Sequence, residues 1–463
     1  MEQPAKEPLQ KALTINLDKS VYGTIAEIGG GQETARWFFR AGGAAGTIAK
    51  SMSAYDMKFS DAIYGHSPRY VSRERLHAML EHEYELVIAR LNASRGQDTC
   101  FFVFANTTAT RSYTYKADGH GWLGIRFQTR PGDAPSQIDL HVNLHGQQSV
   151  QDQETLGILG LNLIYAAAKL HDNPEALLLS LMDNIYQQLA EIDMIDFSGP
   201  AFSRVDNRLM ALRLVEKGLS SAALFHPDGH LVSVADTLWK KAVLVERSRF
   251  RPPTLFTMNL LDCAQHAFLQ DAGLQDDELI VLSEMTLNNL IDGQDIDATD
   301  YLQRAELLCA LGKNVLISNY GEYYRLAQYL FRYTTRPIAL AMGALSLREL
   351  FDEKYYEHLP GGILESFGRL FKHDLSIYAS PALDPQTGKV MTLKDVQVAA
   401  KLRHLFEHLR ENRYLRPLNS INHDYLNIYS HEVLDKIKHR ADDWQHMVPS
   451  QVAQLIQQRD LFH

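Results

Sequence analysis

From residue 191 onward, the sequence alternates short apolar stretches with amphipathic stretches of about 10–15 residues, the lengths typical of strands and of the helices that connect them. The apolar stretches lie at residues 191–199, 221–226, 241–247, 314–319 and 337–343. A strand, a helix and a second strand in succession are typical of βαβ units, whose strands pair in parallel. The sequence therefore predicts the α/β fold class, with mainly parallel, Rossmann-like sheets and some antiparallel strands.

Residues 136–146 show a different pattern, in which polar and apolar residues alternate with a period of two. Ile138, Leu140 and Val142 occupy one face of the expected strand. The polar positions of this strand, with one further candidate nearby, are Asp139, His141, Asn143, His145 and His120. We expect a half-exposed strand that is antiparallel to its neighbour, with these polar groups on the solvated face of an edge strand. Ligation of a divalent metal is the alternative interpretation.

Residues 279–290 are ambiguous between a strand and a helix. Leu279, Leu282, Leu287 and Leu290 recur at spacings that fit one face of a helix. We therefore predict a helix here.

Length and composition predict the division of the chain and its compartment. For 463 residues we expect a loose arm (1–20), an N-terminal α/β domain (21–182), a central α/β domain (183–382) and a small helical C-terminal module (383–463). The C-terminal helices are either a separate module or a contact between copies in a homo-oligomer. The net charge of −10 argues against nucleic acid as the partner. Without a signal-like start or a membrane-spanning apolar run, we expect a cytoplasmic protein that binds no membrane.

A glycine turn, GGG, follows the first predicted strand and precedes a helix at residues 32–41. Gly29, Gly30 and Gly31 are candidate phosphate-binding residues, because backbone amides at a helix N-terminus bind anions. A dinucleotide fingerprint needs a third glycine where Thr34 stands, and Glu33 would repel a phosphate. The competing interpretation is a tight turn without a ligand.

Two other turns are also candidate sites. Gly361 and Gly362 precede a helix and are a second candidate phosphate site, in which Glu365 comes only later in the helix. The sequence HPDGH places His226 and His230 around a Pro-Asp-Gly turn. Because that turn signature needs no ligand, we favour a simple turn over a metal or nucleotidyl-transfer motif.

Polar residues at the predicted strand ends form the more coherent candidate site. Ligands of parallel α/β sheets bind beyond the carboxyl ends of the strands. The candidate catalytic residues are Asp196, Asp206 and Glu246. The candidate substrate-binding residues are Arg204, Arg208, Arg247 and Asn319. Arginine suits carboxylate or phosphate groups, and a carboxylate serves as a base or holds Mg²⁺.

Three functions remain open at this point. The first is an enzyme, nucleotidyltransferase-like at best, that handles a nucleotide or phosphorylated metabolite. The second is a scaffold protein that forms oligomers or filaments. The third is an S-adenosylmethionine-dependent transferase, which rests on the acidic-x-Gly-x-Gly pattern of Glu27, Gly29 and Gly31.

Three long segments, EIGGGQETARWFFRAGGAAGTIAKSMSAYDM, IDMIDFSGPAFSRVDNRLMALRLVEKGL and LRELFDEKYYEHLPGGILESFGRLFKHDL, resemble a bacterial protein family over nearly the whole chain. That family carries two conflicting labels, TonB-dependent receptor and nicotinamide (or nicotinate) mononucleotide adenylyltransferase. A receptor of the first kind needs many alternating lipid-facing strands, which the sequence lacks. The second label implies a soluble α/β enzyme that handles nucleotides. Its early H-x-G-H-type motif is missing after the first strand, where GGGQE stands.

Overall fold

The computed structural model describes residues 6–111, 119–186, 188–292, 295–384 and 387–462. The described residues form two compact units, residues 1–221 and 222–463. This division does not coincide with the predicted boundaries at residues 182 and 382. Strand pairing accounts for the difference, because residues after 182 and after 382 each add a strand to the sheet that precedes them.

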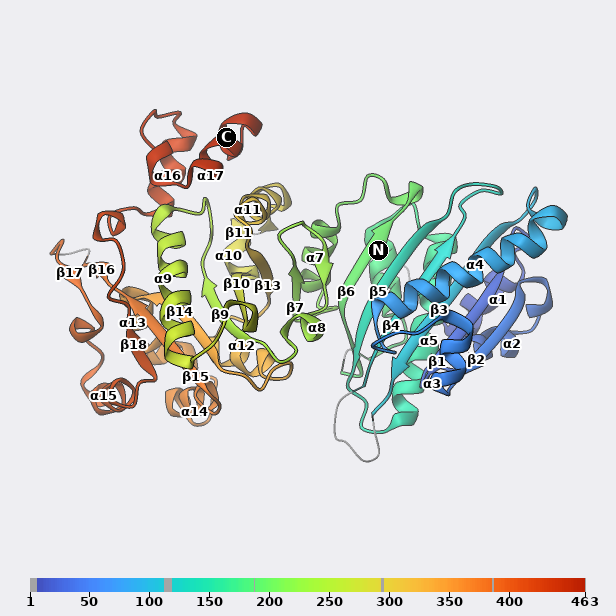
Figure 1. Ribbon diagram of the computed structural model, residues 1–463, viewed down its shortest axis with the longest axis horizontal. Helices are drawn as coiled ribbons and strands as arrows, with labels where there is room; N and C mark the ends of the chain where they lie inside the picture. The colour runs from blue at the N-terminus through green and yellow to red at the C-terminus, as the bar shows by residue number, and fades with distance from the viewer. Residues whose placement is uncertain (1–5, 112–118, 187, 293–294, 385–386, 463) are drawn as a thin grey trace. The chain divides into compact units, whose positions relative to one another are not determined.

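Unit 1 is built on one mixed sheet (Figure 1). Its strands are β1 (Val21–Gly29), β2 (Ile48–Ala54), β3 (Cys100–Ala109), β4 (Gly119–Phe127), β5 (Ser136–Leu144) and β6 (Ala190–Ser198), in the order β2-β1-β3-β4-β5-β6. Its helices are α1 (Pro8–Asn16), α2 (Thr34–Ala41), α3 (Met57–Tyr64), α4 (Arg73–Arg95), α5 (Ser149–Lys169), α6 (Pro174–Leu181) and α7 (Asn207–Glu216). β1, β2 and β3 pair in parallel, and β3 to β6 pair antiparallel.

The first residues are not the loose arm that we expected. α1 inserts Ala12 and Ile15 into the core between the sheet and α5. Lys11 on the same helix is buried, and its ammonium group donates to Oδ1 of Asn162 at 2.8 Å and pairs with Asp183 at 2.7 Å. Residues 1–5 lie outside the described residues.

The strand at residues 136–146 is antiparallel to its neighbours, as predicted, but it is neither half-exposed nor at an edge. β5 lies between β4 and β6, and every one of its residues is buried. The polar side chains of its second face are buried because they pair with acidic and basic groups of neighbouring elements, as described below. α4 crosses this face of the sheet, whereas α1, α2, α5 and α6 pack on the other (Figure 1).

Unit 2 contains a larger, mainly parallel sheet. Its strands are β7 (Ala222–Phe225), β8 (Leu231–Val232), β9 (Ala242–Arg247), β10 (Leu279–Thr286), β13 (Asn314–Ser318), β14 (Ile338–Gly343), β15 (Leu375–Ser380) and β18 (Leu415–Pro417). They lie in the order β18-β15-β14-β9-β10-β13-β7-β8. Numbered along the chain from β9, the parallel strands follow the order 3-2-1-4-5-6 of a doubly wound Rossmann sheet. The prediction of mainly parallel, Rossmann-like sheets is confirmed.

The helix predicted over residues 279–290 is wrong for most of that range. Residues 279–286 form β10, a strand with β9 on one side and β13 on the other, and only α10 (Leu287–Leu290) is helical. A strand that is covered on both faces has no polar alternation, so the leucine spacing imitated a helical one.

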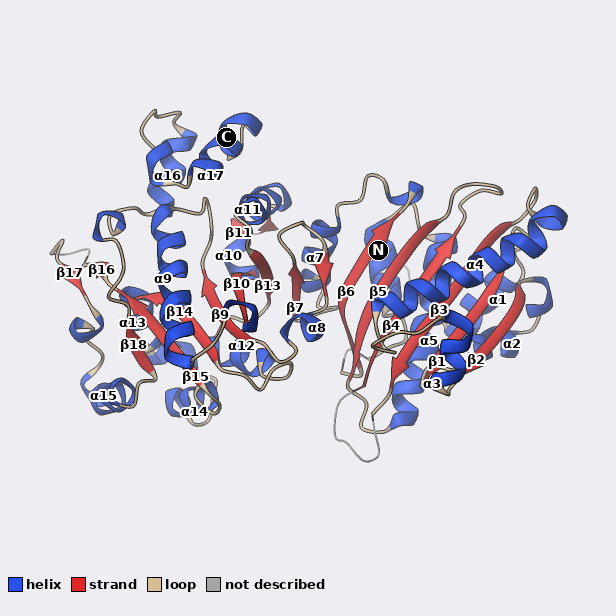
Figure 2. Cartoon of the chain, viewed as in Figure 1, coloured by secondary structure: helices blue, strands red, loops and turns tan. Residues whose placement is uncertain are grey.

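Helices cover both faces of the unit 2 sheet (Figure 2). The larger helices are α9 (Leu255–Ala272), α11 (Ala298–Ala310), α12 (Tyr323–Leu330), α14 (Gly362–Leu370), α15 (Arg403–Glu411), α16 (Ser430–Lys438) and α17 (Ser450–Arg459). Short pieces complete the unit: α8 (Val234–Leu238), α13 (Ala344–Leu350), and the hairpins β11 (Ile291–Asp292)–β12 (Asp295–Ile296) and β16 (Ala382–Leu383)–β17 (Val390–Met391). The C-terminal residues are thus not a purely helical module, because β18 joins the sheet. Within the described residues no helix combines the length and apolarity needed to cross a membrane.

Candidate functional sites

The glycine turn at Gly29–Gly31 is closed by a carboxylate of the same chain. Oε1 of Glu27 accepts from the backbone N–H of Thr34 at 3.1 Å, and Oε2 accepts from that of Ala35 at 3.4 Å. These are the first amides of α2, where a phosphate would bind. The amide of Gly30 donates to the carbonyl of Thr108 at 3.1 Å. The geometry supports the tight-turn interpretation, and phosphate binding by this turn stays a prediction.

The second glycine turn is occupied in the same way. The amide of Gly361 donates to Oε2 of Glu365 at 2.9 Å, and that of Gly362 donates to the carbonyl of Leu359 at 2.9 Å. The sequence makes both amides candidate phosphate donors because no acid follows the turn immediately, and phosphate binding here stays a prediction. Glu365 nevertheless reaches back over the first turn of α14, as an acid often does at a helix N-terminus.

The strand-end residues of unit 1 point in different directions. Asp196 on β6 faces α4, where its Oδ2 accepts from Nη2 of Arg73 at 2.5 Å. Asp206 caps α7 and binds the guanidinium of Arg208 through two hydrogen bonds, of 3.0 and 2.7 Å, so these two residues neutralise each other. Burial tends to raise the pKa of Asp206, but the hydrogen bonds from Arg208 outweigh it and leave this pKa below its usual range. Arg204 is exposed in the turn before α7.

In unit 2, Glu246 and Arg247 lie at the carboxyl end of β9 but on opposite faces of the sheet. Glu246 shares its face with Ala242 and Leu244, which pack against α9. Arg247 lies on the other face, over the ring of Tyr323 of α12 at 4.3 Å. Neighbouring residues of a strand point to opposite sides, so these two cannot contact one ligand from the same side.

Arg247 is held by a buried acid. Its Nε and Nη2 donate to the two carboxylate oxygens of Glu284 on β10, at 2.8 and 3.0 Å. Oε1 of Glu284 also accepts from the hydroxyl of Ser318 at 2.6 Å, and Nη1 of Arg247 donates to the carbonyl of Gly321. This bidentate pair orders the ends of β9, β10 and β13. Asn319, the next residue after β13, is exposed.

Glu246 has the most perturbed environment of the predicted catalytic residues. Burial raises its pKa to about 8, although the charge of Lys313 opposes this rise. Ser283 of β10 is its partner in the strand register. In the part of the chain that the structure describes, neither Oε2 of Glu246 nor the hydroxyl of Ser283 has a hydrogen-bond partner. A buried acid that titrates near neutral pH at a strand end is a common feature of functional sites.

The loop after β9 carries arginines that the sequence analysis missed. Nε of Arg251 pairs with Oδ1 of Asp300 at 2.6 Å, and the other oxygen of Asp300 pairs with Arg304. Arg304 on α11 is only 2% exposed, and its Nη1 donates to the carbonyl of Asn289 at 2.8 Å and to that of Arg249 at 3.3 Å. Burial lowers the pKa of Arg304, and the charges of Arg251 and Arg249 lower it further. The guanidinium groups of Arg251 and Arg304 thus share one carboxylate. The sequence RSRFR directly after a predicted strand was the available signal.

The polar face of β5 holds one charged network at the start of α4. Oδ2 of Asp139 accepts from Nε of Arg73 at 3.0 Å and lies 2.5 Å from Nε2 of His77. Burial tends to raise the pKa of Asp139, but His77 and Arg73 together hold it below its usual range. Among the described residues, no three His, Cys, Asp or Glu side chains converge as a metal site would require. The HPDGH segment is the turn of the β7–β8 hairpin, as predicted.

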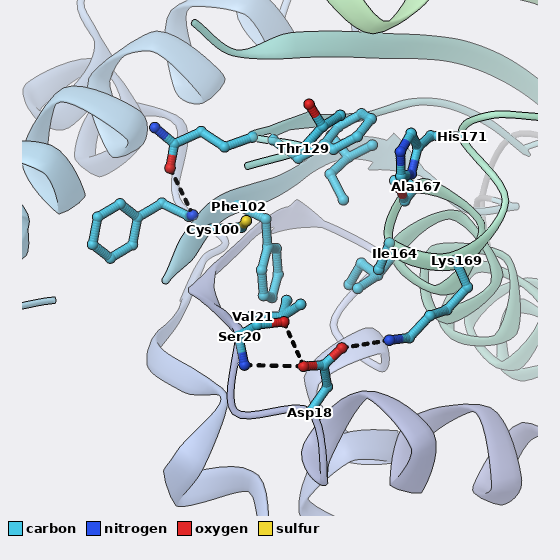
Figure 3. Close-up of a pocket in the computed structure, with 15 residues that line it drawn as sticks. Asp18, Ser20, Val21, Cys100, Phe102, Thr129, Ile164, Ala167, Lys169 and His171 are labelled. Carbon is cyan, nitrogen blue, oxygen red and sulfur yellow. Dashed lines mark hydrogen bonds and ion pairs between the residues drawn. The ribbon is translucent and has the colours of Figure 1, made fainter. Parts of the chain in front are cut away.

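Unit 1 also contains a cavity of about 230 Å³ at the amino ends of β1 and β3 (Figure 3). Its polar groups are largely paired: Asp18 accepts from the amide and hydroxyl of Ser20, at 2.9 and 2.6 Å, and pairs with Lys169. Burial raises the pKa of the Cys100 thiol, which keeps it protonated. None of the sequence-predicted site residues lines this cavity.

No protein-family model and no curated protein matches the chain. Among solved structures, part of the chain is similar to the competence/damage-inducible protein CihA from Agrobacterium tumefaciens, with 16% identity, 36% of this chain and 98% of that chain covered, and a TM-score of 0.25. Another similar structure is a CinA superfamily protein from Escherichia coli (18% identity, 39% and 94% covered, TM-score 0.24). A third is a putative nicotinate-nucleotide adenylyltransferase from Vibrio parahaemolyticus (16% identity, 48% and 95% covered, TM-score 0.21). Likenesses this weak carry no functional argument.

Proposed function

We propose that unit 2 is an enzyme domain that binds a nucleotide or another phosphorylated metabolite beyond the carboxyl ends of β9 and β14. These strands flank the point where the strand order reverses, and doubly wound sheets bind their ligands in the crevice at that point. The observation that carries the proposal is the buried carboxyl group of Glu246 at this position, with its pKa near 8.

Glu246 is suited to move a proton at neutral pH. A general acid or base works best when its pKa lies near the working pH. Because an acid with this pKa is largely protonated at pH 7, the acid–base role is favoured here over the predicted role of a Mg²⁺ ligand. Ser283, which stands beside Glu246 on β10, supplies a second polar group on the same face.

The arginines of the loop after β9 fit the phosphate group of such a ligand. Arg249 and Arg251 follow Glu246 within five residues, and Arg251 and Arg304 both pair with the carboxylate of Asp300. In a chain with a net charge of −10, a local cluster of arginines favours an anionic ligand. Arg247 is tied to Glu284, so we assign it to holding the strand ends rather than to the ligand.

A thermal-shift and calorimetric screen of the full chain tests this function, with nucleotides, nicotinamide cofactors, S-adenosylmethionine and divalent metals as ligands. A ligand at about 100 times its Kd adds about 2.7 kcal/mol of stability. We expect stabilisation by a phosphorylated compound, weakened in Arg249→Gln and unchanged in Arg336→Gln. Arg336 is the matched control because it precedes the amino end of β14, whereas the proposed site lies beyond the carboxyl ends of the strands. Glu246→Gln should retain binding and lose turnover. If no phosphorylated compound stabilises the wild-type chain, the proposal fails.

One observation favours the scaffold alternative. Several large apolar side chains of unit 1 are exposed near the edge strand β2, namely Phe39, Tyr55, Met57 and Phe59. Exposed apolar groups of this kind often mark an interface. Light scattering of the wild type and of Phe59→Glu measures the molar mass of the assembly. If copies associate through this surface, the mass of the variant is lower than that of the wild type. A monomeric wild type excludes the scaffold function.

A further inference from the structure

The cavity at the amino ends of β1 and β3 has an apolar wall that is drawn from both layers of unit 1 (Figure 3). Phe102 on β3 and Ile125 and Phe127 on β4 line it from the sheet, and Ile164 and Ala167 line it from α5. All five of these residues are at most 4% exposed. Buried water needs about two to four polar partners, which this part of the wall does not supply. The wall therefore suits the apolar body of a ligand.

The size of the cavity and its aromatic lining suit a single ring. Its volume of about 230 Å³ exceeds the ~150 Å³ of an apolar cavity that is large enough to bind benzene. Ala167 and Ala168 provide this room, because their short side chains face the cavity where α5 ends. Phenylalanine rings pack against a further ring edge-to-face or offset, and sulfur atoms such as Sγ of Cys100 also favour aromatic contacts. An aromatic ring with a small substituent fits both features.

The charged groups of the wall neutralise each other. Asp18, between α1 and β1, pairs with Lys169 at the end of α5, and its Oδ1 accepts from the amide and the hydroxyl of Ser20 at 2.9 and 2.6 Å. Burial tends to raise the pKa of Asp18, but Lys169 and Ser20 hold it below its usual range, so this carboxylate is ionised. A charged ligand would either break this pair or bury a charge without a partner, and both are costly. The wall thus favours an uncharged ligand.

His171 supplies a hydrogen-bond acceptor. Its Nδ1 lies 3.1 Å from the carbonyl oxygen of Ala167. Because a carbonyl only accepts, Nδ1 carries the proton and Nε2 of the neutral ring carries the lone pair. The amide of Gln128, another polar group of the wall, is already used at both ends: Oε1 accepts from the amide of Phe101, and Nε2 donates to the carbonyl of Asp133, each at 2.9 Å. Nε2 of His171 is therefore the acceptor that suits a ligand hydroxyl.

We propose that this cavity binds a small, uncharged aromatic molecule that carries a hydroxyl group. The ring packs against Phe102 and Phe127, and the hydroxyl donates to Nε2 of His171. Phenol and its small neutral derivatives represent this chemical class. The cavity lies within unit 1 and is lined by other residues than the site proposed for unit 2, so the two proposals are independent.

Methyl NMR of the full chain, labelled with ¹³C at the isoleucine δ1 methyls, tests the site with phenol as the probe. We expect saturable shifts of the Ile125 and Ile164 methyls, which line the cavity. Ile138 and Ile195 are the internal references, because they are buried in the same core but do not line the cavity. Benzoate and benzylammonium carry a charge on a similar ring, and we expect their Kd values to be at least about tenfold higher than that of phenol.

Two variants test the assigned contacts. His171→Phe keeps a ring and removes the acceptor, so it should weaken phenol binding by about fivefold and leave toluene binding unchanged. Ala167→Met extends a flexible side chain into the cavity and should weaken the binding of both probes by at least about tenfold. Ala93→Met is the matched control, because Ala93 is an exposed residue of α4 that does not line the cavity.

Three outcomes overturn the proposal. The first is that phenol leaves the Ile125 and Ile164 methyls unshifted, or shifts those of Ile138 and Ile195 equally. The second is that benzoate or benzylammonium binds as tightly as phenol. The third is that Ala167→Met or His171→Phe binds phenol as tightly as the wild type does. The first two are measured on the wild-type chain, so they decide the matter even if a variant does not fold.

Discussion

Oε1 of Glu27, at the end of β1, lies 3.1 Å from the backbone nitrogen of Thr34, at the start of α2. The same oxygen accepts from Nδ2 of Asn106 on β3 at 3.0 Å. One carboxylate thus joins the parallel strands β1 and β3 to α2, the helix that follows β1, at the place where ligands of such sheets usually bind.

Glu27→Ala is expected to lower the free energy of unfolding of unit 1 by about 1–3 kcal/mol, because it leaves the first amides of α2 without this acceptor and removes one of the two acceptors of the Asn106 amide. Hydrogen exchange of residues 34–41 in the full chain measures the loss. Glu33→Ala, which removes a more exposed acid paired with Arg36, is the control and should change the value by less than about 0.5 kcal/mol. Equal effects of the two variants would contradict this role.

Gly29→Ala should destabilise unit 1 by about 1–3 kcal/mol or more, because Gly29 has a φ of +81° and its new Cβ would lie 2.1 Å from the carbonyl of Thr108. Gly46→Ala is the matched control, since its Cβ meets no atom within 4 Å. Exchange of the β1 and β3 amides distinguishes the two variants. If Gly29→Ala leaves the stability of unit 1 unchanged, the turn is less tightly packed than described.

Glu246 predicts a specific pH dependence. Its pKa is raised from 4.5 to about 8 in the folded chain, so the folded state binds a proton that the unfolded state releases. Stability is therefore full below about pH 4.5 and is lost as the pH rises to about 8, by on the order of 4–5 kcal/mol. Glu246→Gln removes this loss. Hydrogen exchange of the β9 amides should be similar in the two proteins at pH 5 and slower in the variant at pH 9. If the difference between the two proteins is the same at both pH values, the prediction is wrong.

Glu284→Gln should cost about 3–5 kcal/mol, because it leaves the guanidinium of Arg247 without its buried counter-charge. Glu365→Gln, in the more exposed pair with Arg369, is the control and should cost about 1 kcal/mol or less. Exchange of the β10 amides reports both. Replacing both Arg247 and Glu284 with methionine should restore part of the lost stability, because no buried charge is then left unpaired.

The α/β class followed from the sequence because strands and helices alternate at βαβ spacing. β10 was missed because both of its faces are buried, so no period-two signal exists at Leu279–Thr286. The burial of His141 was missed because polarity alone does not reveal that Asp193 lies beside it, and that contact depends on a bulge.

The sequence pattern placed Glu246 and Arg247 correctly at the carboxyl end of β9. The expectation that ligands bind beyond such strand ends, however, assigned both residues to one site. Successive residues of a strand point to opposite faces, so the sequence alone already placed Glu246 and Arg247 on opposite sides of the sheet. Arg304 was not predictable from local sequence, since its partners Arg249 and Asn289 come from the loop after β9 and from α10. The two glycine turns resembled phosphate sites because sequence alone does not show that Glu27 and Glu365 fold back onto them.

The opposite orientation of Glu246 and Arg247 also protects the folding of unit 2 from error. If β9 slipped by one residue against β10, every side chain of β9 would change face. Arg247 would then lie under α9 without an acid, and Glu246 would meet the carboxylate of Glu284. The apolar residues Val243, Leu244 and Val245 are too alike to penalise such a slip strongly, so the two charges at the end of the strand distinguish the correct alignment from the incorrect one.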